Sequence, residues 1–392
     1  MEQVRFGIVG IGNMGSSHAK YLSAGEIEGA VLTAICDLKP DRIEWAKANL
    51  TNPETITYFS DYKEMLKSGL IDALIIATPH YLHPVIGIEA FEAGLHVMSE
   101  KPIGVYTKKV EEFIAAAKKS GKVFGLMFNQ RTNCYYQKIR EMVQGGELGE
   151  LKRCVWIITD WYRTQAYYNS GGWRATWSGE GGGVLLNQAP HNLDLWQWIC
   201  GMPVKVRSHM QFGKWHDIEV EDDVTTVVEY PNGATGTFVT STGEWPGSNR
   251  LEITMDKAKI VVENGKIHLW ELEMTEQEFT ATNTVPFAQP KYSYREVEHG
   301  NTGTGHSGVL NAWAGAILRG EPLVANGEEG INGLTISNAM HLSAWTGKEV
   351  ELPFDDEEFY QLLMERVKTS RRKENVNAVI ADLSDTYNTS SK

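Results

Sequence analysis

The sequence predicts an α/β protein in which an N-terminal doubly wound parallel sheet is followed by an α+β domain with a large, mostly antiparallel open sheet. Two observations carry this prediction. Through about residue 128, short apolar runs alternate with helix-like segments, which is typical of parallel strands with helices on both faces. After about residue 149, longer strand-like runs are joined by turns that contain Asn-Gly, a strong signal for antiparallel hairpins.

Each expected element of the first half has a local reason. Four helices are expected, from about Asn13 to Ala24, from Pro40, from about His83 to Ala93, and from Thr107 to Gly121. Pro suits a first helical position, Thr an N-cap, and Gly the residue after a helix. The strands between them are apolar runs of strand length at Val4–Val9, Val31–Cys36, Ala73–Ala77, His96–Met98 and Val123–Phe128.

The second half is expected to be organised by hairpins. Asn232-Gly233 links Thr225–Glu229 to Thr235–Thr240, and Asn264-Gly265 links Ala258–Glu263 to Lys266–Trp270. Residues 275–301 are mixed and polar, and we expect a loop with at most one strand. The helices that flank the sheet are expected at about Asn187–Cys200, Gly308–Leu318 and Gly330–Thr346.

These expectations divide the chain into an N-terminal cofactor domain over residues 1–128, a substrate-binding and oligomerisation domain over residues 129–353, and a C-terminal helical extension and tail over residues 354–392. The extension is charged and helix-prone up to about Lys373. The polar end of the sequence, Asn-Thr-Ser-Ser-Lys, is expected to fray.

Composition and charge exclude several classes of protein. The chain has 392 residues, of which 42% are hydrophobic and 22% charged, as in an ordinary globular protein. The net charge of −13 argues against a nucleic-acid partner. No apolar run approaches the roughly 18 residues of a membrane helix. The first residues lack the charged and then apolar pattern of a signal peptide.

The cysteines and histidines do not predict a metal site. Four cysteines lie far apart with no Cys-x-x-Cys pair, which argues against a disulfide framework or a zinc site. No His-x-His or His-x-x-x-Glu grouping argues for another metal. We interpret the thiols as reduced and buried, and we expect a cytoplasmic protein.

A glycine-rich turn between the first strand and the first helix predicts a Rossmann dinucleotide site. Gly10 would permit the tight turn, Gly12 would let a pyrophosphate approach the backbone, and Gly15 would let helix and strand pack closely. The N-terminus of the helix would attract the phosphates. A glycine-rich turn without a cofactor is the alternative. The predicted contacts in this turn are Gly10, Gly12, Asn13, Met14 and Gly15.

Asp37 predicts the choice of cofactor. It stands at the end of the second strand, about 20 residues beyond the glycine turn, where an acidic residue binds the ribose hydroxyls of a dinucleotide. Because a carboxylate repels a 2′-phosphate, we expect NAD rather than NADP. Lys39 and Arg42 follow closely and could soften that preference.

Further motifs stand at the carboxyl ends of later strands. Ala77-Thr78-Pro79-His80-Tyr81-Leu82-His83 follows the third expected strand, and Ser99-Glu100-Lys101-Pro102 follows the fourth. Downstream, Gly181–Asp194 combines a glycine run with a histidine, and residues 320–348 continue the pattern. Together with the glycine turn, these motifs resemble the Gfo/Idh/MocA oxidoreductases, the family of glucose–fructose oxidoreductase and inositol dehydrogenase. The resemblance runs from about Val4 to Pro353.

The resemblance implies hydride transfer between a nicotinamide and a hydroxyl of a sugar, sugar derivative or cyclitol. It implies an open sheet that forms homo-oligomers, here a homodimer or homotetramer. Lys101 matches the catalytic lysine of the family, His191 its catalytic histidine, and Glu100 a cofactor contact. The positions that match residues near the nicotinamide half are Thr78, Pro79 and His83.

The residue types suit that chemistry. Oxidation of an alcohol removes a hydride from carbon and a proton from oxygen. Histidine accepts protons near neutral pH, so His191 suits the base. Lys101 would hydrogen-bond the reacting oxygen and could relay its proton. Many members of the family carry Asp where this sequence has Asn187, which adds no charge. On the expected helix Asn187, His191 and Asp194 share one face, so Asp194 could orient His191 or serve packing alone.

Residues 160–177 combine aromatic rings with arginines and polar groups, which is typical of a sugar pocket. They precede the histidine helix and could reach the same site. An aromatic structural loop or a subunit contact would show the same composition. The predicted substrate contacts are Arg163, Tyr168, Trp173, Arg174, Asn187, His191 and His306.

The sequence therefore predicts an NAD-dependent dehydrogenase acting on a secondary hydroxyl of a sugar, glycoside or cyclitol. Two alternatives stay open. One is an enzyme that keeps NAD bound and recycles it, as in a glycosidase or epimerase that passes through a keto sugar. The other is a non-catalytic NAD- or sugar-binding regulator, which would need neither Lys101 nor His191.

Overall fold

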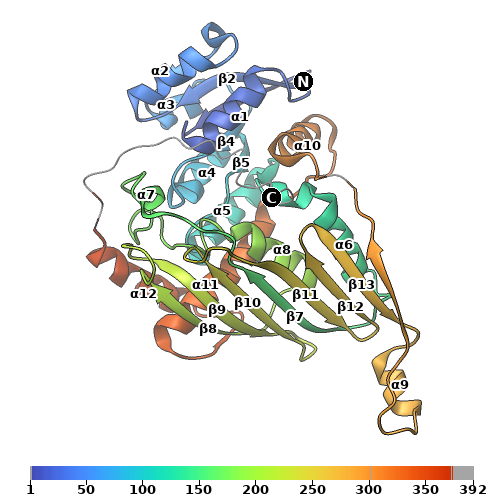
Figure 1. The fold of residues 1–392 in the computed structure, drawn as a ribbon. Helices are drawn as coiled ribbons and strands as arrows, with labels where there is room; N and C mark the ends of the chain where they lie inside the picture. Colours follow the sequence, from blue (N-terminus) through green and yellow to red (C-terminus); the bar gives the residue numbers. More distant parts are fainter. Residues whose placement is uncertain (1, 301, 372, 374–392) are drawn as a thin grey trace.

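The computed structural model describes residues 2–300, 302–371 and 373 of the chain. The described part contains two β-sheets, each with its own helices (Figure 1). The frayed end expected for the last residues lies outside the described part. None of the helices in the described ranges is long and apolar enough to cross a membrane.

The N-terminal sheet is parallel throughout and has the strand order β3-β2-β1-β4-β5-β6. Because the order reverses between β1 and β4, a crevice for a ligand is expected at the carboxyl ends of these strands. The strands are β1 (Val4–Val9), β2 (Ala30–Cys36), β3 (Thr57–Phe59), β4 (Ala73–Ile76), β5 (His96–Ser99) and β6 (Phe124–Leu126). The helices between them are α1 (Asn13–Ser23), α2 (Pro40–Asn49), α3 (Tyr62–Lys67), α4 (Leu82–Glu92) and α5 (Thr107–Ser120).

The second sheet has nine strands in the order β14-β13-β12-β11-β7-β10-β9-β8-β15. All neighbours are antiparallel except β7 and β10. The fold class predicted from the sequence is therefore confirmed. The strands are β7 (Leu151–Ile158), β8 (Lys205–Phe212), β9 (Glu221–Glu229), β10 (Thr235–Ser241), β11 (Asn249–Met255), β12 (Ala258–Glu263), β13 (Lys266–Leu272), β14 (Tyr292–Val297) and β15 (Val350–Glu351).

Both predicted hairpins are present. Asn264 and Gly265 have φ angles of 52° and 73°, the left-handed pair that a tight two-residue turn requires, and Gly233 has a φ of 80°. The polar stretch expected to be a loop forms a short helix, α9 (Glu276–Thr282), and the edge strand β14. In Figure 1 the α9 segment projects away from the sheet. Nearby Val285 and Phe287 are exposed, the latter by 96%.

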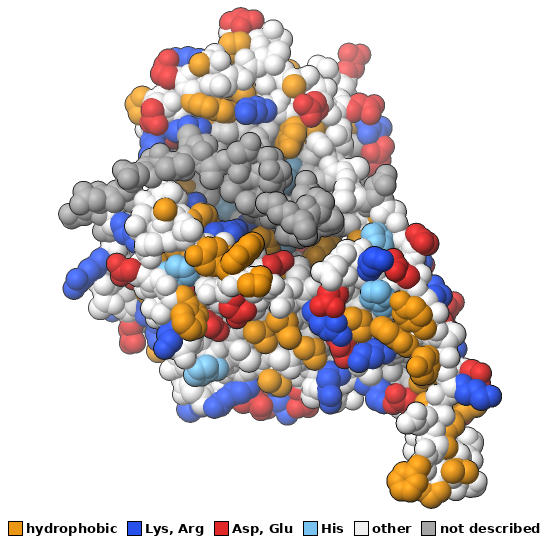
Figure 2. Space-filling model, in the orientation of Figure 1, with side chains coloured by type: hydrophobic (Ala, Val, Ile, Leu, Met, Phe, Trp, Pro, Cys, Tyr) orange, Lys and Arg blue, Asp and Glu red, His pale blue; other side chains and the backbone are white. Residues whose placement is uncertain are grey.

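Helices α6 (Cys134–Gln144), α8 (Pro190–Cys200) and α11 (Gly330–Thr346) cover one face of the second sheet (Figure 1). Trp196 of α8 stacks on Phe238 of β10 with ring centroids 5.2 Å apart, and both side chains are buried. The opposite face carries exposed hydrophobic side chains mixed with charged ones (Figure 2). Val227 on β9 and Tyr294 on β14 are about half exposed there.

Helix α10 (Gly305–Arg319) joins the two halves of the molecule. It follows the last long strand of the second sheet, yet it packs against the first sheet (Figure 1). Trp313 stacks almost flat on Phe6 of β1, with centroids 4.9 Å apart and an interplanar angle of 9°. Both rings are fully buried. Residues far along the chain therefore complete the core beneath β1.

This packing predicts the stability of a Trp313→Ala variant. Removing a fully buried indole leaves a cavity, so we expect a loss of about 3–5 kcal/mol in the free energy of unfolding. Urea unfolding followed by circular dichroism measures it. Trp245 is 78% exposed, and Trp245→Ala should cost no more than about 0.5 kcal/mol. Equal losses in the two variants would contradict this role for α10.

Candidate active site

The glycine turn after β1 has the geometry that a dinucleotide needs. Gly10 has a φ of +90°, and a Cβ there would lie 2.6 Å from the carbonyl oxygen of Ala77. A Cβ at Gly15 would lie 1.8 Å from the Gly10 carbonyl oxygen. A Cβ at Gly12 would meet nothing within 4 Å, so this backbone borders open space at the N-terminus of α1. The turn therefore fits a pyrophosphate.

Asp37 supplies the negative charge at the end of β2. Its carboxylate accepts hydrogen bonds from the backbone N–H groups of Ile11 at 2.7 Å and Lys39 at 2.9 Å. Arg42, which could have offset this charge, does not face the solvent beside Asp37. Arg42 is buried and donates to the Ile11 carbonyl at 2.6 Å and to Ser16 Oγ at 3.0 Å. Arg42 therefore stabilises the glycine turn, and the ribose contact predicted for Asp37 stays a prediction.

Glu100 and Lys101 follow β5 at the carboxyl edge of the parallel sheet. Glu100 is buried, and its Oε1 lies 2.7 Å from Nε2 of His18 on α1. Burial by itself would raise the pKa of Glu100. The hydrogen bond from His18 and the charge of Lys101 outweigh burial and lower it. His18 lies on the buried face of α1, just after the glycine turn, and no motif in the sequence singles it out.

Lys101 reaches across to the second domain. Its Nζ donates to the main-chain carbonyl of Asn187 at 3.0 Å. The segment after β4 is held against the same strand end by His83. The two ring nitrogens of His83 lie 2.7 Å from the carbonyl oxygens of Thr78 and Pro102. Thr78 and Pro79 are thereby fixed beside the lysine, at the carboxyl ends of β4 and β5.

His191 lies in the first turn of α8 and is buried. Burial lowers its pKa well below the usual value for histidine, and the charge of Lys101 adds to the shift. His306, at the start of α10, is shifted to a pKa of about 4, again chiefly by burial. Both imidazoles are therefore neutral near pH 7, the state in which a histidine accepts a proton.

The expectation that Asn187, His191 and Asp194 share one helix face is wrong. Helix α8 begins at Pro190, which has no N–H to donate and suits a first helical position, so Asn187 lies in the preceding turn. Asp194 does lie on α8, but both of its oxygens accept hydrogen bonds from Arg131, at 2.6 and 2.8 Å. Asp194 belongs to a buried ion pair.

In the predicted substrate loop, several side chains contact Tyr167, which is not among the contacts predicted from the sequence. The Tyr167 hydroxyl lies 3.2 Å from Oδ1 of Asn187 and receives a hydrogen bond from Arg174 at 2.7 Å. The guanidinium of Arg163 lies 5.2 Å from the Tyr167 ring centroid. Trp173 contacts His80 edge-on, with centroids 5.7 Å apart.

Tyr168 points elsewhere. It is buried, and its hydroxyl donates to Thr242 Oγ1 at 2.8 Å. Its ring lies 4.8 Å from that of His216, as part of the packing beneath the loop. The role predicted for Tyr168 in substrate binding stays a prediction.

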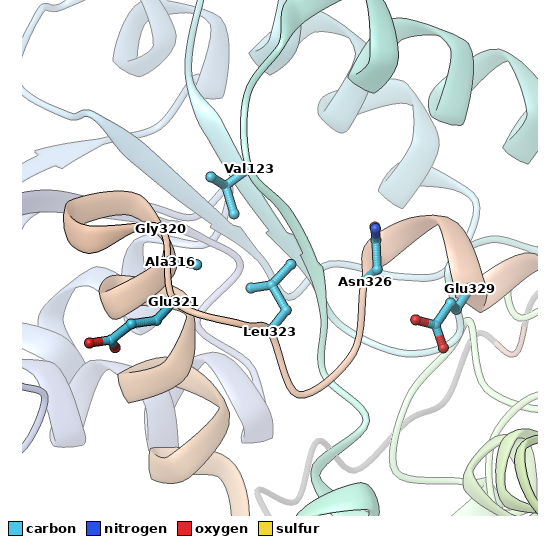
Figure 3. A pocket seen from close by; sticks show the side chains of 7 residues that line it. All are labelled: Val123, Ala316, Gly320, Glu321, Leu323, Asn326 and Glu329. Carbon is cyan, nitrogen blue, oxygen red and sulfur yellow. The ribbon is translucent and has the colours of Figure 1, made fainter.

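A surface hollow of about 410 Å³ lies away from these residues (Figure 3). It is formed by the end of α10, the segment that follows it, and Val123, which immediately precedes β6. Ligands of doubly wound sheets bind at the carboxyl ends of the strands, and this hollow lies at the amino end of β6. We do not assign it to the cofactor.

Comparison with known proteins agrees with this geometry. Residues 4–128 match the model of the oxidoreductase family with an NAD-binding Rossmann fold. Residues 136–261 match the GFO/IDH/MocA C-terminal domain. The chain belongs to the Gfo/Idh/MocA oxidoreductase family. The resemblance inferred from the sequence motifs is thereby confirmed.

Relatives within this family act on sugars and cyclitols. The chain is 25% identical over 358 residues to myo-inositol 2-dehydrogenase of Thermotoga maritima, covering 89% of this chain and 98% of that protein. It is 30% identical over 251 residues to D-glucoside 3-dehydrogenase of Escherichia coli, covering 59% of this chain and 68% of that protein. The WlbA dehydrogenase of Bordetella pertussis, solved with NADH and UDP-GlcNAcA, has a TM-score of 0.76 and 26% identity, covering 90% and 100% of the two chains.

This Gfo/Idh/MocA protein is an NAD-binding oxidoreductase of the sugar and cyclitol dehydrogenase type. The residues predicted to hold the cofactor, the glycine turn and Asp37, lie together, and the N–H of Ile11 in that turn donates to Asp37 at 2.7 Å. In the described ranges, no group of three or more His, Cys, Asp or Glu side chains is arranged to hold a metal ion.

The geometry at β2 predicts how an Asp37→Ala variant chooses its cofactor. Removing the carboxylate removes the repulsion toward a 2′-phosphate, so the ratio of kcat/KM for NAD over NADP should fall by about tenfold, or ~1.4 kcal/mol. Steady-state kinetics with both cofactors measure the ratio. Asp41→Ala removes an exposed charge nearby and should leave it unchanged. A ratio that Asp37→Ala does not lower would contradict the role of this carboxylate.

Proposed function

We propose that the protein oxidises a secondary hydroxyl of a sugar, glycoside or cyclitol with NAD, and that Lys101 and His191 handle the proton. One observation carries the proposal. At the carboxyl edge of the parallel sheet, Lys101 Nζ donates to the carbonyl of Asn187 at 3.0 Å, four residues before the buried His191 in the first turn of α8. A cation that binds an alkoxide and a neutral base are the two groups that alcohol oxidation requires.

When bound, NAD accepts the hydride from the substrate carbon. The residues of the chain do the rest. The glycine turn and Asp37 hold the dinucleotide at the N-terminus of α1. Lys101, fixed by the carbonyl of Asn187, would donate a hydrogen bond to the reacting oxygen and stabilise its negative charge. His191 would take the proton, and its burial keeps water away from the reacting groups.

Residues 160–188 are proposed to bind the sugar. The guanidiniums of Arg163 and Arg174 lie over the ring of Tyr167, and that of Arg174 also lies over Trp173. These arginines would donate to hydroxyl groups of a sugar beside the aromatic rings. His306, which lies 5.9 Å from His18 between ring centroids, would close the other side of the site.

We further infer a homo-oligomer through the open face of the second sheet and a cytoplasmic location. Exposed side chains such as Val227, Tyr292 and Tyr294 on that face support the first inference.

A panel of sugars, glycosides and inositols, scored for NADH formation, tests the proposed function. A dehydrogenase accumulates NADH in proportion to oxidised sugar. An enzyme that recycles bound NAD would convert its substrate without accumulating NADH. A regulator would bind sugar and NAD, as measured by calorimetry, and would convert neither.

Lys101→Ala should lower kcat by about two to four orders of magnitude, the usual contribution of a proton-transfer group. The affinity for NAD should persist, because the glycine turn supplies most of the binding. Stopped-flow turnover and NAD titration measure the two effects. Lys109→Ala removes a lysine from α5, where it pairs with Glu112, and should leave both unchanged. Loss of NAD binding with normal turnover at saturation would make Lys101 a cofactor ligand only.

The buried position of His191 predicts the pH dependence of oxidation. A base acts only when deprotonated, and burial lowers the pKa of His191. Activity should therefore hold as pH falls past about 6.5, the ordinary pKa of histidine, and decline only at lower pH. The profile of kcat/KM at low sugar and saturating NAD measures this limb. His191→Asn should remove most turnover at every pH, and a limb above pH 7 would contradict the proposed base.

A further inference from the structure

Glu180 is a buried carboxylate at the end of the substrate loop that the proposed mechanism does not use. Its side chain is 1% exposed. Its Oε2 accepts the backbone N–H of Ala175 at 2.5 Å. Its Oε1 accepts a hydrogen bond from Nδ2 of Asn187 and lies 3.9 Å from Nη1 of Arg174. A buried charge persists only when several groups compensate it, and these three do so.

Glu180 fixes the orientation of the Asn187 amide. A carboxylate only accepts hydrogen bonds, so the NH₂ group of Asn187 must face it. Oδ1 of Asn187 then faces the hydroxyl of Tyr167 at 3.2 Å and Nε2 of Gln188 at 3.3 Å. The main-chain carbonyl of the same asparagine accepts Nζ of Lys101 at 3.0 Å. Glu180 thus fixes the side chain of Asn187, and the backbone carbonyl of Asn187 fixes Lys101.

A strained turn depends on the same carboxylate. Ala175 has a φ of 55°, a left-handed conformation that costs about 1–2 kcal/mol in a residue with a Cβ. Its N–H is the group that donates to Glu180. The main-chain carbonyl of Glu180 also lies 3.2 Å from Nδ1 of His80, which follows β4. Glu180 therefore connects the substrate loop, the end of β4 and the turn before α8.

We propose that Glu180 is a positioning residue that acts through Asn187 on Lys101, and that the two side chains form one unit that needs one carboxylate and one amide. The proposal rests on the proposed function, since Lys101 is the group whose position matters. The single negative charge of the pair lies on Glu180, which is hydrogen-bonded to the asparagine whose carbonyl accepts from Lys101.

The charges around the pair decide what each substitution does. Burial raises the pKa of Glu180, and Glu221 adds to the shift, while Arg174 opposes it. Asn187→Asp would place a second carboxylate against Glu180, so the two would share a proton at low pH and repel each other at high pH. The charged and titratable groups that face the pair are Arg174, Tyr167, His80, Lys101, Glu221 and Lys373.

Exchanging the two groups should restore the unit. In Glu180→Gln/Asn187→Asp, the new amide oxygen at 180 can accept the N–H of Ala175. Its NH₂ group can donate to the new carboxylate at 187, which still accepts from Tyr167. Every hydrogen bond keeps a donor and an acceptor, and one negative charge remains. In Glu180→Gln alone, the amide at 180 can accept from only one of Ala175 and Asn187, so the other contact brings two donors together. The negative charge of the pair is also lost.

The experiment is a double-mutant cycle in the full-length protein, read by kcat, sugar KM and their pH profiles. We expect each single variant to lower kcat by about tenfold or more, and the double variant to recover most of that loss, because contacting residues couple strongly. Asn187→Asp should regain activity as pH falls from 8 toward 6, opposite to the trend set by His191. The double variant should lack this feature.

Asn232→Asp is the matched control. It adds the same charge at an exposed position in the β9–β10 turn, outside the proposed sugar-binding segment, where Asn232 accepts the N–H of Ala234 and does not contact Glu180. It should change neither kcat nor the pH profile. Losses of kcat that simply multiply in the double variant, or an Asn187→Asp profile like that of the control, would overturn the proposal.

Thermal unfolding of the four proteins keeps this test separate from the proposed function. If no sugar, glycoside or inositol in the panel supports NADH formation by the wild type, the proposed function fails. The pair is then judged by Tm at pH 6 and pH 8. Recovery of Tm in the double variant, with a pH-dependent loss in Asn187→Asp, would support the pairing. Additive losses of Tm would overturn it.

Discussion

The hydrogen bond from Lys101 Nζ to the carbonyl of Asn187 is the contact on which the candidate active site depends, because it joins the segment after β5 to the turn before α8 in the second domain. Lys101 is fixed to the parallel sheet by β5 and by the neighbouring Glu100–His18 pair. Asn187 belongs to the turn before α8 in the second domain. The geometry of the candidate site therefore depends on how the two domains are placed. Helix α10 follows the last long strand of the second sheet and packs on the first sheet through Trp313 and Phe6.

Burial sets the protonation of the histidines around this contact. His80, His191 and His306 all have pKa values lowered chiefly by desolvation, and the charge of Lys101 adds to each shift. Lys101 lies among these neutral imidazoles. Two buried carboxylates are hydrogen-bonded nearby, Glu100 to His18 and Glu180 to Asn187. The proposed site therefore combines a lysine with neutral imidazoles and hydrogen-bonded carboxylates.

The sequence predicts the first sheet better than the site. The glycine turn, the strand runs and the Asn-Gly hairpins are local signals, and the structure contains each of them. Strand β3 is three residues long, too short for a periodic pattern. His18 pairs with Glu100 and Asp194 with Arg131, partners that lie 82 and 63 residues away, so no local spacing reveals these contacts. Glu180 contacts Ala175 and Asn187 within seven residues, but inside a turn that has no periodic pattern. The start of α8 was misjudged because apolar residues before Pro190 extend the helical pattern into a turn.

A chain of hydrogen bonds runs through the predicted substrate loop from Arg174 through Tyr167 and Asn187 to Glu180. The charged groups at its two ends decide which atom donates at each step. Arg174 can only donate, and it donates to the Tyr167 hydroxyl at 2.7 Å, as Gln188 does at 3.1 Å. The hydroxyl proton must then go to Oδ1 of Asn187, whose NH₂ group faces Glu180, a group that can only accept. Because each link fixes the next, the loop presents a defined set of donors and acceptors before any sugar arrives. Such preorganisation lowers the cost of binding a polar ligand.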